Sequence, residues 1–416
     1  MITCNLHKIK PVKKRRLVKI RKERKYFLAY FIEMRRIFAF DKVGAQVVNL
    51  FFNQNLSLNQ ISRKTNCTKE EIEEFLTKLK KELLTLYDGG YPIVEHEQML
   101  TPIAVELQIN NQCNLRCKHC CQDNYEKMMP YNNVSQILKI LYQANVFEIN
   151  LVGGEIFLHP YILEILALCD KYDFAVNLVT NATLLDASLV KRLSRFRNLA
   201  LLISLEGVRD DNDKIRGIGV FKKVNKVIKQ LKKRGIHFEI STTINAQNII
   251  RYRKMIEYAN SFGVACNFNL FKPFHESQKK LILQPTKYFK FVNHVLTLRK
   301  RGALVGLTNA SIVAFFNKLK KRNECRATLS GLTIDVDGHM VPCPFLRLAG
   351  FYQNVLLPKF NRNFLNTWKN NKYFKEFRRR NLRECQVCSY VFNKNINEPS
   401  PYGLIAFKKW LKNKKS

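Results

Sequence analysis

Short apolar segments rich in β-branched residues alternate with amphipathic segments through the middle of the chain. The apolar segments predict six strands, at Ala104–Ile109, Glu148–Val152, Ala175–Val179, Ala200–Leu205, His237–Ile244 and Val264–Leu270. The segments between them have helical spacing and predict helices near Tyr131–Gln143, Tyr161–Lys171, Ala187–Arg195, Val220–Arg234 and Ile249–Phe262. This alternation predicts an α/β fold with a parallel sheet and right-handed crossovers. Six units are fewer than the eight that close a barrel, so we expect a partial (β/α)6 TIM barrel.

A different pattern precedes the first of these strands. Alternating aromatic residues predict two short strands, Phe27–Phe31 and Arg35–Phe40, and three helices follow at Lys42–Phe52, Ser57–Thr65 and Thr68–Leu84. Ser57 and Thr68 each begin a capping-box sequence, which is typical of a helix start. Two strands and three helices predict a winged-helix-like unit, and Asp88–Gly90 predicts a linker turn after it.

Composition limits the class of protein. The chain has 416 residues, of which 46% are hydrophobic, so it can bury a substantial core and is not a disordered protein. No apolar stretch reaches the roughly 18 to 20 residues that span a bilayer, and the N-terminus lacks the apolar region of a signal peptide. We therefore expect a cytoplasmic protein with no membrane partner.

The net charge leaves the partner open. With 71 Lys and Arg against 33 Asp and Glu, the formal charge is +38, and such an excess favours nucleic acid or an acidic peptide as a partner. Dense basic runs occur only near the ends of the chain, at Lys8–Lys25 and Lys408–Lys415. The abundance of Lys, Asn, Ile and Phe is also typical of an A/T-rich genome, and that bias explains the charge equally well.

Seven of the twelve cysteines fall into two groups with the spacing of metal ligands. The first group is Cys113, Cys117 and Cys120, on the loop that follows the first predicted strand, where parallel α/β folds place ligands. A structural zinc site or an iron–sulfur cube is normally closed by four ligands. Three thiolates leave one iron open to a substrate or cofactor, unless His119 or Cys121 supplies a fourth ligand.

The second group lies far downstream. Its members are Cys325, Cys343, Cys385 and Cys388. Four thiolates could hold either an iron–sulfur cluster or a structural zinc ion. Of the other cysteines, Cys169 ends an apolar helical run and is predicted to pack in the core. Cys266 lies in the sixth strand, where core packing is favoured over a position facing the barrel interior.

The loops after the strands resemble the radical S-adenosylmethionine (SAM) superfamily. The resemblance rests on the three-cysteine motif and on four further segments: Gly153-Gly154-Glu155, Thr180-Asn181-Ala182, Ser204-Leu205-Glu206-Gly207, and Arg216 with Gly217 to Phe221. It implies that the three cysteines bind a 4Fe–4S cluster whose open iron binds SAM. It also implies that Gly153, Gly154 and Glu155 meet the SAM amino group and that Ser204 and Arg216 hold its carboxylate, with Asn181 a further contact. Ile156 and Ala182 depart from the Pro and Gly that the family usually has at these positions.

The second cysteine group resembles the Twitch and SPASM domains of the same superfamily. Gly338 and the following residues to Cys343 match their Gly-x4-Cys motif, and Cys385 to Cys388 match Cys-x2-Cys. No cysteine follows Cys388, so the resemblance implies one auxiliary 4Fe–4S cluster, held by Cys325, Cys343, Cys385 and Cys388. A zinc site with the same four ligands is the alternative.

The N-terminal unit resembles the leader-peptide-binding fold of ribosomal-peptide maturation, the RiPP recognition element. The segment from Phe40 to Ala45 and the three helices after it carry this resemblance. In that fold a leader peptide adds as an extra strand to a small sheet, which requires an exposed strand edge. Met34–Phe40 could supply that edge. Because winged helices also bind DNA, DNA binding stays an alternative.

Together these features predict five regions. They are a basic arm with the leader-binding unit (1–98), a radical SAM partial barrel (99–275), a helical connection (276–322), an auxiliary-cluster domain (323–398) and a basic tail (399–416). The resemblance implies a radical SAM enzyme that modifies a ribosomally made precursor peptide carrying a leader, by crosslinking, epimerisation or a related change. It also implies an electron donor of the flavodoxin or ferredoxin type. An RNA- or nucleotide-modifying radical SAM enzyme and a DNA-binding redox sensor are the alternatives.

Overall fold

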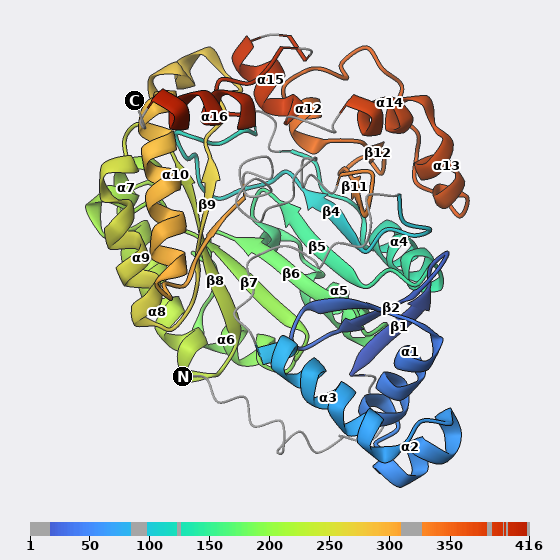
Figure 1. The fold of residues 1–416 in the computed structure, drawn as a ribbon. Coiled ribbons are helices and arrows are strands. Elements are labelled where there is room, and N and C mark those ends of the chain that lie inside the picture. Colours follow the sequence, from blue (N-terminus) through green and yellow to red (C-terminus); the bar gives the residue numbers. More distant parts are fainter. Residues whose placement is uncertain are drawn as a thin grey trace.

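Two β-sheets organise the chain: a three-stranded sheet near the N-terminus and a nine-stranded sheet at the centre (Figure 1). The computed structural model describes residues 17–84, 98–122, 126–308, 327–380, 385–393, 395–396 and 398–413. The predicted linker turn at Asp88–Gly90 lies outside the described residues.

The large sheet contains the six predicted strands in chain order. They are β4 (Ala104–Asn110), β5 (Glu148–Gly153), β6 (Ala175–Thr180), β7 (Leu199–Ser204), β8 (His237–Ile244) and β9 (Cys266–Leu270). All six are parallel, with β10 (Val305–Leu307) added beside β9 and β11 (Gly331–Ile334) and β12 (Met340–Val341) added beside β4. The predicted α/β fold with a partial barrel is confirmed, and three strands extend the sheet beyond it.

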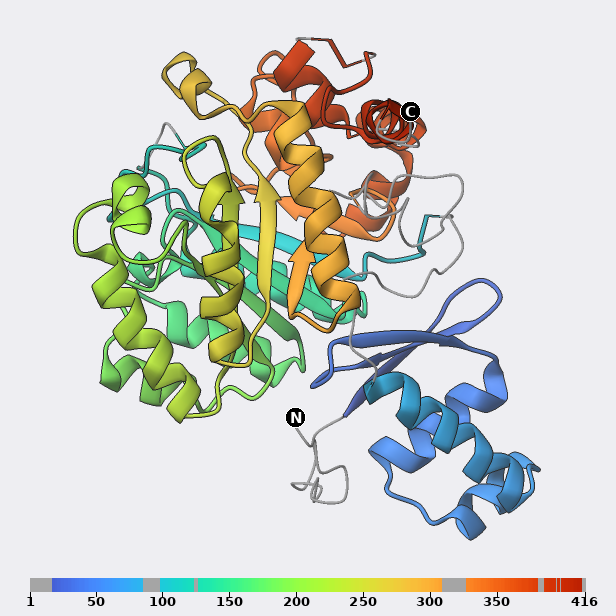
Figure 2. The ribbon, with the colours of Figure 1, turned by 60° about the vertical axis from the view of Figure 1, so that its left-hand side comes forward.

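Helices cover the outer face of this sheet (Figures 1 and 2). They are α4 (Tyr131–Gln143), α5 (Ile162–Lys171), α6 (Ala187–Leu193), α7 (Asp210–Arg216), α8 (Val220–Lys233), α9 (Tyr252–Ser261) and α10 (Pro285–Lys300). Alternate residues of β4, such as Val105 and Leu107, are fully buried in the core with these helices. Cys169 and Cys266 are fully buried in the same core, so their predicted packing role is confirmed.

The opposite, inner face of the sheet is polar. Its strand positions include Glu106, Asn150, Asn177, Glu239 and Asn267. Asn177 donates to Asn150 Oδ1 at 2.7 Å, and Asn267 donates to Glu239 Oε2 at 2.6 Å. Alternation along each strand therefore separates an apolar, helix-covered face from a face that can meet polar ligands.

The N-terminal unit contains three strands rather than the predicted two. They are β1 (Val18–Lys22), β2 (Phe27–Phe31) and β3 (Arg36–Phe40), followed by α1 (Lys42–Val48), the π-helical turn η2 (Asn49–Asn53), α2 (Leu58–Thr65) and α3 (Lys69–Leu84). The capping box at Ser57 is present, and Thr68 and Glu71 bond each other's backbone N–H groups in the same way. The stretch expected to be a basic arm therefore contains β1, and two of its basic side chains, Lys19 and Arg21, are bound by backbone carbonyls of the barrel region.

One face of this small sheet packs on its own helices and the other on the barrel. Ala29, Phe31 and Leu79 form part of the core on the helical side. On the other side, Lys19 Nζ donates to the carbonyl of Val146 at 3.0 Å, immediately before β5. The sheet therefore lies against the end of the barrel where the parallel strands begin (Figures 1 and 2).

The C-terminal region adds helices around the end of the barrel where the strands finish (Figure 2). They are α12 (Pro344–Leu348), α13 (Phe364–Asn370), α14 (Lys372–Arg380), α15 (Gln386–Asn393) and α16 (Leu404–Asn413). The segment after residue 398, expected to be a basic tail, contains α16, in which Phe407 is fully buried with its ring 5.2 Å from that of Phe289 in α10. None of the helices in the described part of the chain has the length and the apolar character that a membrane span requires.

Candidate functional site

The loop with the first three cysteines follows β4 and is held by contacts from two distant segments. The N–H of Lys118 bonds to the carbonyl of Ile215 in α7 at 3.0 Å. Gln278, in the 3-10 helix η5 (Glu276–Leu281), donates to the carbonyl of Cys120 at 2.7 Å. These bonds fix the loop at the carboxyl edge of the sheet, as the sequence predicts.

The three thiols lie close enough to influence one another. Burial raises the pKa of Cys113, and the neighbouring Cys120 raises it further. Burial also raises the pKa of Cys117 to about 11, although Arg216 acts in the opposite direction. Without a metal the thiols of Cys113 and Cys117 are protonated at neutral pH, so metal binding by these two residues must release protons.

Gly153 and Gly154 let the end of β5 approach this loop. A Cβ atom at Gly154 would lie 2.5 Å from the carbonyl oxygen of Asn111, well inside van der Waals contact. A backbone hydrogen bond holds the two segments together at this point: the N–H of Glu155 donates to the carbonyl of Gln112 at 2.7 Å. The glycine pair therefore packs directly beneath the cysteine loop.

We expect Gly154→Ala to impair assembly of the metal site on the cysteine loop. The added methyl group would push the backbone of Asn111 and Gln112 away, and the loop would lose its position relative to β5. Iron content and visible absorption after anaerobic reconstitution measure the effect. Gly235→Ala is the control, since a Cβ there meets no atom within 4 Å and carries only the strain of a positive φ. Normal iron binding by Gly154→Ala would contradict this view of the loop.

Glu155 joins three loops below the cysteines. It is fully buried, and its carboxylate accepts hydrogen bonds from the hydroxyl of Thr180 and the N–H of Asn181, both at 2.7 Å, and from the N–H of Phe157. Burial raises the pKa of Glu155 against the effect of these donors. The described contacts of this carboxylate are all internal, so it orders the loop after β6.

Asn181 connects that loop to the first cysteine. Its Nδ2 lies 3.8 Å from Cys113 Sγ and donates to Asn114 Oδ1 at 2.9 Å. Ala182 follows with φ 59°, in the left-handed region that favours glycine. The Gly-to-Ala departure seen in the sequence therefore falls on a position where alanine is strained.

Arg216, at the end of α7, reaches the second cysteine. Its Nη1 lies 3.8 Å from Cys117 Sγ, and its Nη2 donates to Glu206 Oε1 at 2.7 Å. His119 Nε2 lies 3.3 Å from the same Glu206 oxygen. Burial alone would raise the pKa of Glu206, but His119 and Arg216 together lower it to about 2. Ser204 lies two residues before Glu206, half-buried at the carboxyl end of β7.

Several buried polar atoms around the loop have no hydrogen-bond partner among the described residues. They are Asn110 Oδ1, His119 Nδ1 and Arg216 Nε. Such atoms are costly unless a ligand or water satisfies them. The structure therefore brings the predicted Gly153, Gly154, Asn181 and Arg216 around the three cysteines, beside unsatisfied groups suited to a polar ligand.

The second cysteine group is partly within the described residues. Cys343 caps α12 and Cys385 precedes α15, and both contribute to one apolar cluster. The thiol of Cys388 hydrogen-bonds Cys385, and this bond, helped by Lys272, lowers the pKa of Cys385 to about 6. Cys385 is therefore a thiolate at neutral pH, which is the form of cysteine that binds metals. Cys325 lies outside the described residues.

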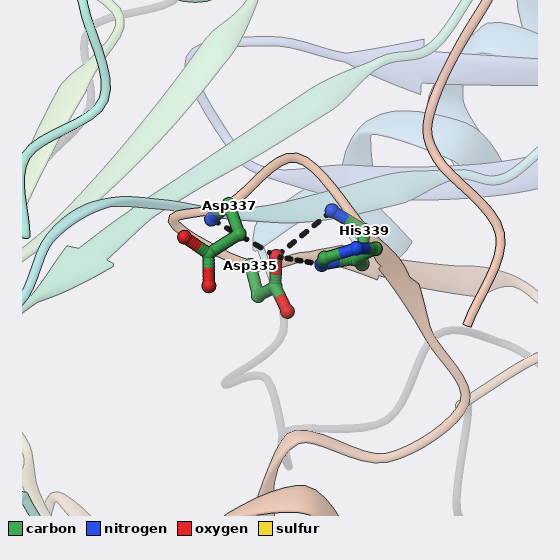
Figure 3. Close-up of side chains that lie close together, drawn as sticks. All are labelled: Asp335, Asp337 and His339. Carbon is green, nitrogen blue, oxygen red and sulfur yellow. Dashed lines mark hydrogen bonds and ion pairs between the residues drawn. The ribbon is translucent and has the colours of Figure 1, made fainter. Parts of the chain in front are cut away.

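Asp335, Asp337 and His339 lie close together in the turn between β11 and β12 (Figure 3). Asp335 Oδ1 accepts from the N–H groups of Asp337 at 3.1 Å and His339 at 2.8 Å. Arg347 pairs with Asp335 at 2.9 Å, and Lys127 pairs with Asp337 at 2.7 Å. The N–H bonds to Asp335 close the turn, which leads the chain toward Cys343, and both carboxylates have basic partners.

Sequence reasoning missed the role of Glu206 and weighed His119 only as a possible fourth metal ligand. The structure turns His119 toward Glu206 instead. The signal in the sequence was Glu206 itself, a carboxylate two residues after the apolar strand that ends at Ser204. An acid that is buried at such a position requires a cationic partner.

Two family models match the chain in separate regions. Residues 107–259 match the radical SAM superfamily, and residues 325–389 match the iron–sulfur cluster-binding (SPASM) domain. The first region contains the three-cysteine loop and Arg216, and the second contains the four downstream cysteines.

Two curated proteins and one solved structure are similar to this chain over more than half of its length. Mycofactocin maturase MftC of Mycobacterium tuberculosis is 24% identical over 318 residues, which are 70% of this chain and 76% of that protein. The antilisterial bacteriocin subtilosin biosynthesis protein AlbA of Bacillus subtilis is 25% identical over 257 residues, 58% of this chain and 55% of that protein. The crystal structure of Streptococcus suis SuiB bound to precursor peptide SuiA has a similar fold, with a TM-score of 0.65 and 17% identity over 88% of this chain and 90% of that chain.

Proposed function

We propose that this chain, an enzyme that carries a radical SAM domain and an iron–sulfur cluster-binding domain, modifies a ribosomally made precursor peptide. The sequence-based identification of both domains is confirmed by the family models. The observation that carries the proposal is the three-thiol loop held beside unsatisfied buried polar groups at the carboxyl edge of the sheet. The names of the relatives, which include maturases and a protein bound to its precursor peptide, support a peptide substrate.

The residues around the first cysteine loop fit both implied cofactors. Cys113, Cys117 and Cys120 would hold a 4Fe–4S cluster through three irons, since His119 is engaged by Glu206. When bound, the cluster and SAM together supply a 5′-deoxyadenosyl radical that abstracts hydrogen from an unactivated carbon. Arg216 Nε, which no other described residue bonds, would be the donor for the SAM carboxylate. Ser204 would bind the same carboxylate, and Gly153, Gly154, Glu155 and Asn181 would shape the site around the amino group.

The second cysteine group would hold one auxiliary 4Fe–4S cluster. Cys343, Cys385 and Cys388, which lie within the described residues, would supply three ligands, and Cys325 would supply the fourth. The lowered pKa of Cys385 supports a metal-binding role. We further propose a reducing, cytoplasmic setting and an electron donor of the flavodoxin or ferredoxin type, because both clusters depend on reduced thiols and on reducing equivalents.

The N-terminal sheet has a strand edge to which a leader peptide could add. In the order β1-β2-β3, the outer side of β3 has no strand partner among the described residues. The N–H of Ile32 points toward β1, so Phe31 directs its backbone groups to its partner Arg36 in β3. By alternation, Ile37 and Ala39 direct their N–H groups away from β2, to the open edge.

We expect Ala39→Pro to weaken leader binding strongly without unfolding the unit. Proline removes one outward N–H from the edge, and the side chain of Ala39 is exposed. Ile37 is less suitable for this test, because its side chain is fully buried against the barrel. Fluorescence anisotropy of a labelled leader peptide on the full chain measures the effect, and circular dichroism checks the fold. Ala39→Ser, which keeps the N–H, is the matched control. Equal leader affinity in both variants would exclude strand addition at β3.

Co-expression with the products of short reading frames that neighbour the gene tests the whole proposal. A peptide that changes mass only when SAM is present and the three cysteines are intact would support it. Activity on RNA, with steeply salt-dependent RNA binding and no modified peptide, would contradict a peptide substrate and support the RNA-modifying alternative.

A further inference from the structure

Glu206 is a buried carboxylate that joins the guanidinium of Arg216 and the imidazole of His119 beside the three-cysteine loop. Its side chain is 1% exposed, and one oxygen, Oε1, contacts both Arg216 Nη2 at 2.7 Å and His119 Nε2 at 3.3 Å. The other oxygen accepts the N–H of Thr243 in β8 at 2.8 Å. The carboxylate therefore links the cysteine loop, the end of α7 and a neighbouring strand.

The backbone of Glu206 is held independently of its carboxylate. Its N–H donates to Asn212 Oδ1 at 3.0 Å, and its carbonyl accepts from Asn248 Nδ2 at 3.2 Å. Both asparagines are buried. A change confined to the side-chain charge should therefore leave the loop after β7 in place.

We propose that Glu206 is a positioning residue that fixes Arg216, and through it the SAM carboxylate, relative to the cysteine loop. This inference rests on the proposed SAM site. A long arginine side chain has many rotamers, and holding it in one of them costs free energy that a bound ligand would otherwise supply. Glu206 binds Nη2, and Nε has no hydrogen-bond partner in the part of the chain that the structure describes, so one edge of the guanidinium is available to a ligand.

His119 makes this arrangement dependent on the cysteine loop. It lies between Cys117 and Cys120, and its contact with Glu206 brings the loop to the same oxygen that holds Arg216. Arg216 in turn reaches Cys117 Sγ at 3.8 Å. The position of Arg216 is thereby defined with respect to the cluster ligands, which orients SAM relative to the open iron.

The test compares Glu206→Gln, Arg216→Ala and the double variant in anaerobically reconstituted protein. The amide of Glu206→Gln would keep the shape and one acceptor but lose the charge, so we expect SAM to bind about 10-fold more weakly. Arg216→Ala should weaken SAM binding more, by roughly 10- to 150-fold. If Glu206 acts through Arg216, its substitution should add less than about 2-fold in the Arg216→Ala background. Equilibrium binding of SAM and the electron paramagnetic resonance spectrum of the reduced cluster with SAM are the readouts.

Asp211→Asn is the matched control. Asp211 lies in the same helix as Arg216 and pairs with Arg251 at 3.1 Å, without a described contact to the cysteine loop. This variant should change SAM affinity by less than about 2-fold. Iron content should stay at the wild-type value in all variants.

The outcomes separate this inference from the site on which it rests. Unchanged SAM affinity in Arg216→Ala would overturn the proposed SAM site. A weakened Arg216→Ala variant beside an unchanged Glu206→Gln variant would overturn only the positioning role. Additive effects in the double variant, or loss of iron from Glu206→Gln, would also overturn it, because Glu206 would then act on something other than Arg216.

Discussion

Replacing Cys113, Cys117 and Cys120 together with alanine is expected to remove about half of the iron and to abolish SAM cleavage. Two 4Fe–4S clusters correspond to about eight irons per chain, and the variant should keep the about four that belong to the auxiliary cluster. The loop holds three mutually influencing thiols, so loss of all three leaves no anchor for the first cluster. Iron analysis and detection of 5′-deoxyadenosine after reduction measure the two effects.

Cys121→Ala is the control for this experiment. Cys121 is adjacent to the loop and similarly exposed, but it is outside the predicted ligand set. We expect this variant to keep its full iron content. Loss of the first cluster in Cys121→Ala would show that the site is closed by four ligands. Zinc in place of iron at the second cysteine group would overturn the proposed auxiliary cluster.

Arg21→Ala is expected to destabilise the docking of the N-terminal unit by about 3 to 5 kcal/mol. The Arg21 side chain is buried, bonds Glu23 at 2.9 Å, and donates to the carbonyls of Thr101, Pro102 and Asn145 at 2.7 to 3.0 Å. Removal would leave a buried carboxylate and several carbonyls without their donor. The expected result is a lower midpoint of thermal unfolding and faster cleavage by thermolysin in the N-terminal region.

The neighbouring Lys22→Ala variant is the control for Arg21. Lys22 is the next residue of β1, and its side chain is exposed. Its substitution should change the midpoint little, since exposed charges contribute little to stability. Equal behaviour of the two variants would indicate that the bonds of Arg21 do not hold the unit on the barrel.

The central sheet could be predicted because its helix-covered face buries every second strand residue, which places apolar residues at regular positions in the sequence. The limits of β8 and α4 agree with those predicted from the sequence. β1 was missed because Lys19 and Arg21 occupy strand positions that would ordinarily be apolar, and only the barrel carbonyls explain them. β11 was missed because it is short and is stabilised by pairing with β4, which is more than 200 residues earlier in the sequence.

The candidate site could be predicted only as far as its motifs are local. The cysteines were found from their spacing, and the glycine pair and Arg216 from the family resemblance; the structure brings them to one edge of the sheet. The shared contacts of Glu206 were missed, because they join residues 119, 206 and 216, and a sequence pattern does not report such distances. The internal role of the Glu155 carboxylate also depends on the position of Thr180 in the next strand.

The position of the small sheet sets a minimum length for the peptide. Its open edge belongs to a unit docked where the barrel strands begin, whereas the cysteine loop follows the end of β4. The eight residues of β8 represent the height of the barrel, about 26 Å at ~3.3 Å per residue. An extended peptide covers at most about 3.3 to 3.6 Å per residue. A leader bound at β3 would therefore act as a ruler: at least about eight residues must separate its paired strand from the first position that can reach the radical, and closer positions should escape modification.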